Sequence, residues 1–143
     1  MSDSTQAVIS YTDEEPIDAD QFIALLRRSG LAERRPVEER PRIASMVLNA
    51  DILMTAWDGN ELVGVARSVT DFAYCCYLSD LAVDADYQNR GIGKALIRHT
   101  AALLASDCQI ILLSAPAAQE YYPALGFVQH DSAWCGPAST FIR

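Results

Sequence analysis

The first fifty residues alternate between apolar and polar positions in two different periods. Residues 6–12 alternate as a half-buried strand does, and residues 20–30 place a stripe of apolar side chains along one helix face. Asp18 or Asp20 is suited to cap the start of this helix, and Gly30 is suited to end it. The pattern therefore predicts a strand followed by a short amphipathic helix.

A charged segment separates this helix from the rest of the predicted sheet. Residues 31–42 mix both charges with two prolines, which predicts a loop. The loop leads into a second short helix over residues 43–49. Because the segment comes directly before the main strands, it is a candidate lid.

The middle of the chain predicts a hairpin and a third long strand. Residues 51–69 contain two apolar runs that are joined at Asp58, Gly59 and Asn60, where glycine and asparagine tolerate positive φ. Residues 72–83 then continue as another strand. Antiparallel pairing of the first pair is expected because a tight turn connects them.

The second half predicts two helices and three strands. We expect a helix over residues 91–105 and, because residues 109–115 form a continuous apolar run, a strand covered on both faces. A short helix over residues 117–125 is followed by terminal strands over residues 127–136 and 139–143. The order β-α-α-β-β-β-α-β-α-β-β predicts a mixed α/β (α+β) fold. Its central mixed sheet would have about six to seven strands and helices on both faces, giving three α/β/α layers.

Composition sets limits on the domain count and on the partners. At 143 residues, half of them apolar, the chain has the size of one domain, residues 1–143, with a sizeable core. The net charge of −8 argues against general nucleic-acid binding and makes a neutral or cationic small molecule the easier partner. Seven acids lie between Asp51 and Asp86 against one base, Arg67. They form either a solvated acidic surface or a funnel that attracts amines.

The sequence has no pattern typical of a membrane span, a signal peptide or a metal site. No apolar run approaches the ~20 residues of a membrane span, and residues 1–15 lack the basic start and apolar middle of a signal peptide. The four cysteines show no paired metal-ligand spacing. We therefore expect a cytoplasmic protein with no membrane partner and no metal site.

The turn QNRGIGK, residues 88–94, lies between a predicted strand and a predicted helix. The N-terminus of a helix offers unpaired N–H groups and partial positive charge, so such a turn suits an anion. Lys94 is followed by alanine, which excludes a P-loop, and Leu96 stands where a dinucleotide fingerprint needs its third glycine. The remaining pattern is [QR]-x-x-G-x-[GA], whose glycines either let an anion approach the backbone or only permit a tight strand-to-helix turn.

This turn resembles that of the GCN5-related N-acetyltransferase (GNAT) family. LAVDADYQNRGIGKAL is similar to the family's segment from the central strand into the following helix, and EYYPALGF is similar to its later aromatic-Tyr-x-x-x-Gly-Phe signature. The two segments are separated about as in the family. The resemblance covers nearly the whole element order and implies direct transfer of an acetyl group from acetyl-CoA to an amine, without a nucleophilic side chain.

The resemblance also assigns roles to residues of this chain. Tyr122 corresponds to the tyrosine that protonates the departing thiolate. Asp80, a carboxylate on a covered strand, is the candidate general base or amine anchor. Strand residues would offer backbone groups to the pantetheine arm and the thioester, and the turn would hold the pyrophosphate; these donor-binding residues are Leu81, Ala82, Val83, Gln88, Asn89, Arg90, Gly91, Ile92, Gly93 and Lys94.

The sequence also allows other functions and several kinds of partner. A non-catalytic acyl-CoA-binding regulatory module is the main alternative to an enzyme, and a nucleotide-phosphate enzyme is a third reading. The acceptor is an amine of a small molecule or of a protein, and a homodimer through the terminal strands is possible by resemblance. Many family members carry an asparagine near the position of Ala115 and Pro116, where Ser114 could partly substitute.

Overall fold

The computed structural model describes residues 8–118 and 120–142. The chain divides into two compact units, Met1–Leu113 and Ser114–Arg143, and each is described by itself. The predicted positions 6, 7, 119 and 143 fall outside the described residues. Among the helices that are described, none is long and apolar enough to cross a bilayer.

The first unit contains one five-stranded mixed sheet in the order β1-β2-β3-β4-β5. The first four strands are antiparallel neighbours, and β4 and β5 are parallel because a helix connects them. The mixed sheet and its parallel connection are as predicted. The strands are β1 (Ile9–Thr12), β2 (Ile52–Asp58), β3 (Glu61–Thr70), β4 (Cys75–Val83) and β5 (Gln109–Ile111).

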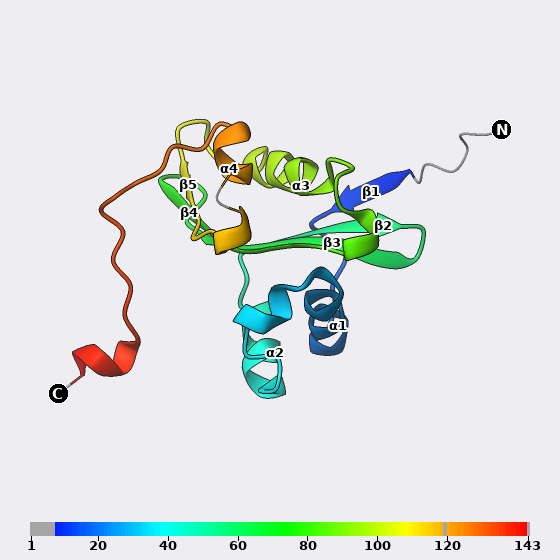
Figure 1. The fold of residues 1–143 in the computed structure, drawn as a ribbon, viewed down its shortest axis with the longest axis horizontal. Coiled ribbons are helices and arrows are strands. Elements are labelled where there is room, and N and C mark those ends of the chain that lie inside the picture. The colour runs from blue at the N-terminus through cyan, green and yellow to red at the C-terminus, as the bar shows by residue number, and fades with distance from the viewer. Residues whose placement is uncertain (1–7, 119, 143) are drawn as a thin grey trace. The chain divides into compact units, whose positions relative to one another are not determined.

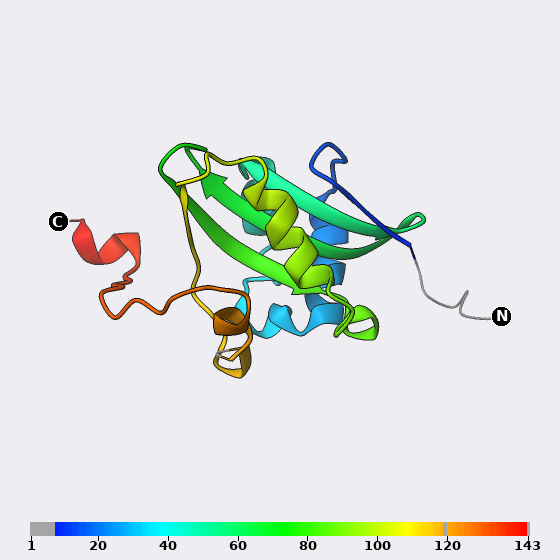
Figure 2. The same ribbon diagram turned by 90° about the horizontal axis from the view of Figure 1, so that it is seen from above.

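Helices cover both faces of this sheet (Figures 1 and 2). On one face, α1 and α2 pack over a core that includes Phe22, Leu26 and Ile43, and on the other face α3 packs over a core that includes Leu78 and Leu96. The three-layer arrangement is therefore confirmed. The helical elements of this unit are α1 (Ala19–Ser29), η2 (Leu31–Arg34), α2 (Arg40–Leu48), η3 (Ala85–Tyr87) and α3 (Ile92–Ala101).

The ends of α1 follow from its sequence. The Asp18 carboxylate accepts a hydrogen bond from the Gln21 N–H at 2.8 Å, and the Gln21 side chain accepts one from the Asp18 N–H at 2.9 Å. This reciprocal pair satisfies N–H groups that the first turn leaves without partners. Gly30 ends the helix with φ 89°, which costs glycine little. Both predicted boundaries are confirmed.

The close approach of α3 to the sheet depends on Gly64. A Cβ atom at this position would lie 3.1 Å from Leu96, 3.2 Å from Ile92 and 3.3 Å from Ala56. We expect Gly64→Val to lower the free energy of unfolding by about 1–3 kcal/mol, because the extra side chain has no space. Urea denaturation measures this, with Glu61→Val on the same strand as an exposed control. An unchanged midpoint for Gly64→Val would show that α3 can move away from the sheet.

The number of strands was predicted wrongly. The structure has five strands instead of six to seven, because the described residues of the two expected terminal strands form none. Residues 128–142 are exposed, so no packed face holds them as strands, and Pro137 between the two expected strands has no N–H for pairing. The second unit contains instead the short elements η4 (Pro116–Ala118), α4 (Tyr121–Ala124) and η5 (Ala138–Phe141).

Several predicted boundaries also differ from the structure. The second helix begins at Arg40, inside the predicted loop, because Pro41 occupies a first-turn position where a missing N–H costs nothing. α3 ends at Ala101, and tight turns follow, with the Leu103 N–H donating to the Thr100 carbonyl oxygen at 3.0 Å. The strand expected over residues 109–115 is limited to β5.

Candidate functional site

The turn that follows β4 is tied to α1 and β3. The Asp84 carboxylate accepts hydrogen bonds from the Asp86 N–H at 2.9 Å and from Arg28 Nε at 2.7 Å. Arg28 also donates to the Leu62 carbonyl oxygen at 2.6 Å. The start of the turn is therefore fixed relative to the sheet.

The turn reaches α3 through two residues with left-handed backbone. Gln88 donates from Nε2 to the Val83 carbonyl oxygen at 3.0 Å, Asn89 has φ 65° and Gly91 has φ 80°. In the described structure no side chain caps α3, and a Cβ atom at Gly91 would meet no atom within 4 Å. Free N–H groups at an accessible helix N-terminus suit a phosphate group. The turn thus fits the pyrophosphate cradle expected of residues 88–94.

The two cations of this turn are placed differently. Arg90 folds back, donating to the Asp86 carbonyl oxygen at 3.1 Å and lying 5.0 Å from the ring centroid of Tyr87. The Tyr87 hydroxyl donates to the Asp58 carboxylate at 2.5 Å, and this bond is the main reason that the pKa of Tyr87 rises to about 12. Lys94 is exposed in the first turn of α3, so it is the more available charge for an anion.

β4 and β5 separate to form a fork. They pair at Cys75, Cys76 and Tyr77, and in the described residues no strand continues on this side of β4 from there to Val83, whereas β3 pairs along the other side. Leu81 and Val83 pack toward α3, whereas the Ala82 side chain packs toward α1. Since all three side chains contribute to the core, any ligand in the fork would contact the backbone of this segment.

A bulge in β4 turns Asp80 toward α2. Ser68 pairs with Leu78 and Arg67 pairs with Asp80, so Ser79 is the extra residue. A single extra residue exchanges the faces on which the following side chains lie. Leu78 accordingly belongs to the core under α3, and Asp80 lies on the opposite face.

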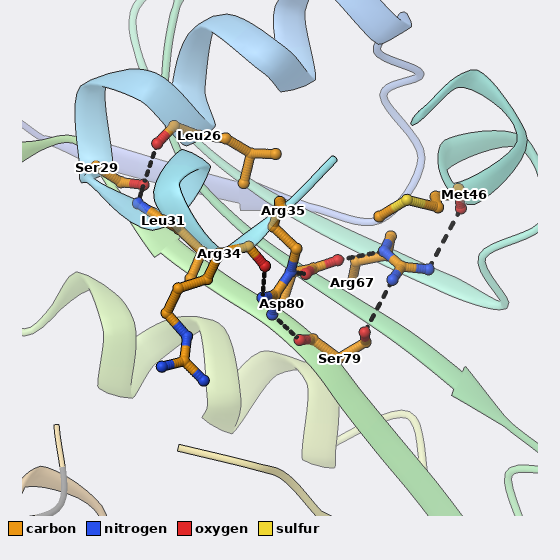
Figure 3. Close-up of polar contacts among 9 residues, drawn as sticks. All are labelled: Leu26, Ser29, Leu31, Arg34, Arg35, Met46, Arg67, Ser79 and Asp80. Atoms are coloured by element: carbon orange, nitrogen blue, oxygen red, sulfur yellow. Dashed lines mark hydrogen bonds and ion pairs between the residues drawn. The ribbon is translucent and has the colours of Figure 1, made fainter. Parts of the chain in front are cut away.

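Asp80 is buried between two arginines (Figure 3). Arg35 Nε donates to one carboxylate oxygen and Arg67 Nε donates to the other. Arg35 also donates to the Ser79 carbonyl oxygen at 2.7 Å, and Arg67 donates to the Ser79 hydroxyl at 2.9 Å and to the Met46 carbonyl oxygen at 3.5 Å. Each oxygen of Asp80 is thus occupied by a guanidinium group.

A pocket of about 340 Å³ lies beside this ion cluster. It opens where β4 and β5 separate, and its walls come from η2 and the loop after it, from α2, β3 and β4, and from Leu113 after β5. None of the described residues that line it is acidic. The polar lining residues are Arg34, Arg35, Arg42, Arg67, Tyr77 and Ser79.

Tyr122 belongs to the second unit, Ser114–Arg143. Its ring meets Tyr121 edge-on at 5.1 Å and Phe127 edge-on at 5.7 Å between centroids. Burial, and to a smaller degree the neighbouring Tyr121, raises the pKa of Tyr122 above its ordinary value of 10.0. The phenol is therefore protonated at neutral pH.

Sequence reasoning brought the turn and β4 together but missed the arginine pocket. The segment with Arg34, Arg35 and Arg42 was interpreted as a charged loop, although it folds into η2 and α2. One signal was available, since Arg67 stands alone in an otherwise apolar strand pattern and needs a carboxylate partner. The identity of that partner depended on the bulge at Ser79.

Comparison with protein families and curated proteins gives two matches of interest. The acetyltransferase (GNAT) domain family matches residues 49–129. The chain is also similar to the histone acetyltransferase TAP1 of Glycine max, with 32% identity over 138 residues that cover 87% of this chain and 58% of TAP1. The chain spans 58%, 30% and 27% of three curated plant proteins that it matches.

Solved structures share the fold. A probable acetyltransferase from meticillin-resistant Staphylococcus aureus has a TM-score of 0.73 at 19% identity, over 91% of this chain and 97% of that one. An aminoglycoside acetyltransferase from an uncultured soil metagenomic sample, solved with sisomicin, has a TM-score of 0.63 at 20% identity, over 91% and 93%. At these identities the likeness concerns the fold alone.

Proposed function

Because the chain belongs to the acetyltransferase (GNAT) family, we propose that it is an acetyl-CoA-dependent N-acetyltransferase that acts on an amine of a small molecule or protein. The observation that carries this proposal is the start of α3. No described side chain caps this helix N-terminus, Asn89 and Gly91 have left-handed backbone there, and the turn follows β4, whose edge beyond Tyr77 is not paired with β5. An uncapped helix start that follows a free strand edge suits a ligand with both a diphosphate and an amide-bearing arm.

We propose that the donor contacts two segments of the first unit. The N–H groups of residues 89–94 would hold the pyrophosphate, with Lys94 adding charge and Gln88 at the entrance. The backbone of Leu81, Ala82 and Val83 would pair with the pantetheine arm, in the place where β5 no longer pairs with β4. Arg90 would act mainly by keeping the turn in shape, since its guanidinium group is already bonded within it.

The proposed reaction needs two proton transfers. Acetyl-CoA supplies a thioester carbonyl carbon, to which the amine nitrogen bonds while the carbon–sulfur bond breaks. Tyr122 would donate its phenolic proton to the departing thiolate, and the raised pKa keeps it protonated for this task. The proton that leaves the amine would pass to water, so that the products are an acetamide and a free thiol.

Asp80 was expected to act either as a general base or as an anchor for the amine, and its contacts bear on both roles. A general base must reach the proton that it removes, but Asp80 is buried and a guanidinium group lies against each of its oxygens. We propose that Asp80 positions Arg35 and Arg67 at the pocket, and that it influences the acceptor through them. The relatives' names refer to histones and aminoglycosides, which are both amine-bearing acceptors, and do not choose between a small molecule and a protein.

An acetyl-transfer assay tests the proposal against the alternative of a non-catalytic acyl-CoA-binding module. The purified chain is incubated with labelled acetyl-CoA and a panel of amines, and acetylated product is separated by chromatography. Calorimetry with acetyl-CoA, ATP and NAD runs in parallel. Turnover on an amine supports the enzyme; tight acetyl-CoA binding without turnover on any amine would favour the module.

Lys94→Gln should weaken donor binding moderately. We expect the KM for acetyl-CoA to rise about 3-fold to 10-fold with kcat nearly unchanged, because one charge is lost while the backbone donors remain. Steady-state kinetics at low salt measure this. Arg98→Gln, one turn later on the same helix, is the matched control and should leave the KM unchanged. If both variants raised the KM for acetyl-CoA equally, the effect would come from the overall positive charge of α3 and not from a contact of Lys94 with the donor.

A further inference from the structure

Cationic side chains are concentrated around the pocket beside Asp80. The chain has eleven basic residues against nineteen acidic ones. Four of the basic residues nevertheless line this one pocket, and they come from three different elements and the loop after η2; they are Arg34, Arg35, Arg42 and Arg67. Charges this close act together, because screening by salt takes effect only over a Debye length of about 8 Å.

The acids near these arginines do not balance them. Asp80 provides one negative charge for both Arg35 and Arg67. Arg42 has Glu39 at 3.6 Å, but both side chains are more than half exposed, so this pair is weak. Arg34 has no acidic partner in the described part of the chain, and its guanidinium group extends away from Asp80 (Figure 3). The cluster therefore keeps an excess of positive charge.

We propose that this pocket binds an anionic group, a carboxylate or a phosphate, which the amine acceptor itself carries. The inference rests on the proposed function and narrows its acceptor to small amines with an acidic group. Guanidinium groups bind both kinds of anion in bidentate fashion. Arg34 and the weakly paired Arg42 provide the available donors, whereas Arg35 and Arg67 are held in place by Asp80 and Ser79.

The position of the pocket brings such an acceptor to the reaction. Tyr77 and Ser79 line it from β4, and Leu113 lines it from the chain just after β5. The pocket therefore lies at the fork, next to the strand segment proposed to hold the thioester. Its volume of about 340 Å³ suits a molecule of amino-acid size. An amine bound there by its anionic end would be held at the fork while that end stays unchanged in the transfer.

The same charges act against strongly cationic acceptors. A polyamine or a lysine-rich peptide would bring further positive charge to four arginines, and like charges at short distance cost binding free energy. The acidic residues elsewhere on the surface do not reverse this, since they do not line the pocket. The proposal therefore predicts that the cationic pocket prefers an acceptor with an anionic group to a polycationic one.

Matched acceptor pairs test the proposal. Acetyl transfer is measured for a set of amino acids against their carboxamides, and for phosphoethanolamine against ethanolamine, with spermidine as the cationic comparison. We expect the anionic member of at least one pair to have a kcat/KM at least about tenfold higher. Preference in the first set assigns a carboxylate, and preference in the second assigns a phosphate.

Substitutions then connect the preference to the pocket. Arg34→Gln and Arg42→Gln change exposed side chains, so folding should be retained. Each should raise the KM for the anionic amine about tenfold, and leave kcat and the KM for acetyl-CoA nearly unchanged. Arg40→Gln, on the same helix as Arg42 but outside the pocket, is the control and should behave as wild type.

The outcomes separate this proposal from the proposed function. If amines are acetylated without preference for the anionic member, or if Arg34→Gln and Arg42→Gln match Arg40→Gln, the anionic acceptor is wrong and the enzyme stands. If no amine is acetylated at all, the proposed function fails. In that case, calorimetric titration of malonate still tests whether the pocket binds anions. Malonate binding that Arg34→Gln and Arg42→Gln weaken, and that Arg40→Gln leaves unchanged, would support an anion site. The absence of malonate binding would overturn it.

Discussion

Replacing Tyr122 with phenylalanine is expected to lower kcat at least about 100-fold and to change the KM for acetyl-CoA by less than about twofold. The substitution removes the proton donor for the thiolate but keeps the ring that packs edge-on against Tyr121 and Phe127. Fold and donor binding should therefore persist. Chromatographic detection of acetylated product, with acetyl-CoA varied at saturating amine, measures both constants.

The pH dependence of kcat shows whether Tyr122 acts as a general acid or only packs against its neighbours. Because burial raises the pKa of Tyr122 above 10.0, the protonated form is complete through neutral pH and is lost only above that value. The wild type should therefore show an alkaline decline of kcat above pH 10, and Tyr122→Phe should lack it. Tyr121→Phe is the matched control with near wild-type kcat. A Tyr122→Phe variant that keeps full kcat would remove Tyr122 from the chemistry.

Local features of this chain could be predicted from its sequence. Asp18, Gly30 and the Gly59 turn act through neighbouring backbone, so their types and spacing determine the boundaries of α1 and of the β2–β3 hairpin. The same holds for Gly91, whose left-handed backbone at the start of α3 favours glycine whatever packs elsewhere. The family resemblance was confirmed because its motifs also depend on short spacings.

Features that depend on distant segments could not be predicted in this way. The expected terminal strands had suitable apolar residues, but a strand also needs a partner edge and a packed face, and residues 128–142 are exposed. The arginine pocket depends on the bulge at Ser79, which moves Asp80 to the face of α2. No alternation pattern reveals this bulge, because apolar residues both precede and follow the pair Ser79 and Asp80.

Asp80→Asn is expected to lower the free energy of unfolding by about 3–5 kcal/mol, which would be the largest stability effect among these variants. The asparagine fits the same space, but it leaves the guanidinium groups of the buried Arg67 and the partly buried Arg35 without a counter-charge. Urea denaturation followed by circular dichroism measures the change. Asp20→Asn removes the same charge from an exposed pair with Arg40, and its midpoint should stay close to wild type.

The cluster of Asp80, Arg35 and Arg67 contains one carboxylate and two guanidinium groups. This ratio predicts which of its substitutions destabilises the protein more. Arg67→Met leaves one carboxylate with one guanidinium, a balanced pair with Arg35, whereas Asp80→Asn leaves the positive charges of Arg67 and the partly buried Arg35 side by side. Arg67→Met should therefore destabilise less than Asp80→Asn, even though it also removes the donor to the Ser79 hydroxyl. In the double variant, removal of Arg67 should restore part of the loss caused by Asp80→Asn, a coupling of about 1–3 kcal/mol. Purely additive effects would show that water already solvates these arginines, so that Asp80 does not hold them in place for the pocket.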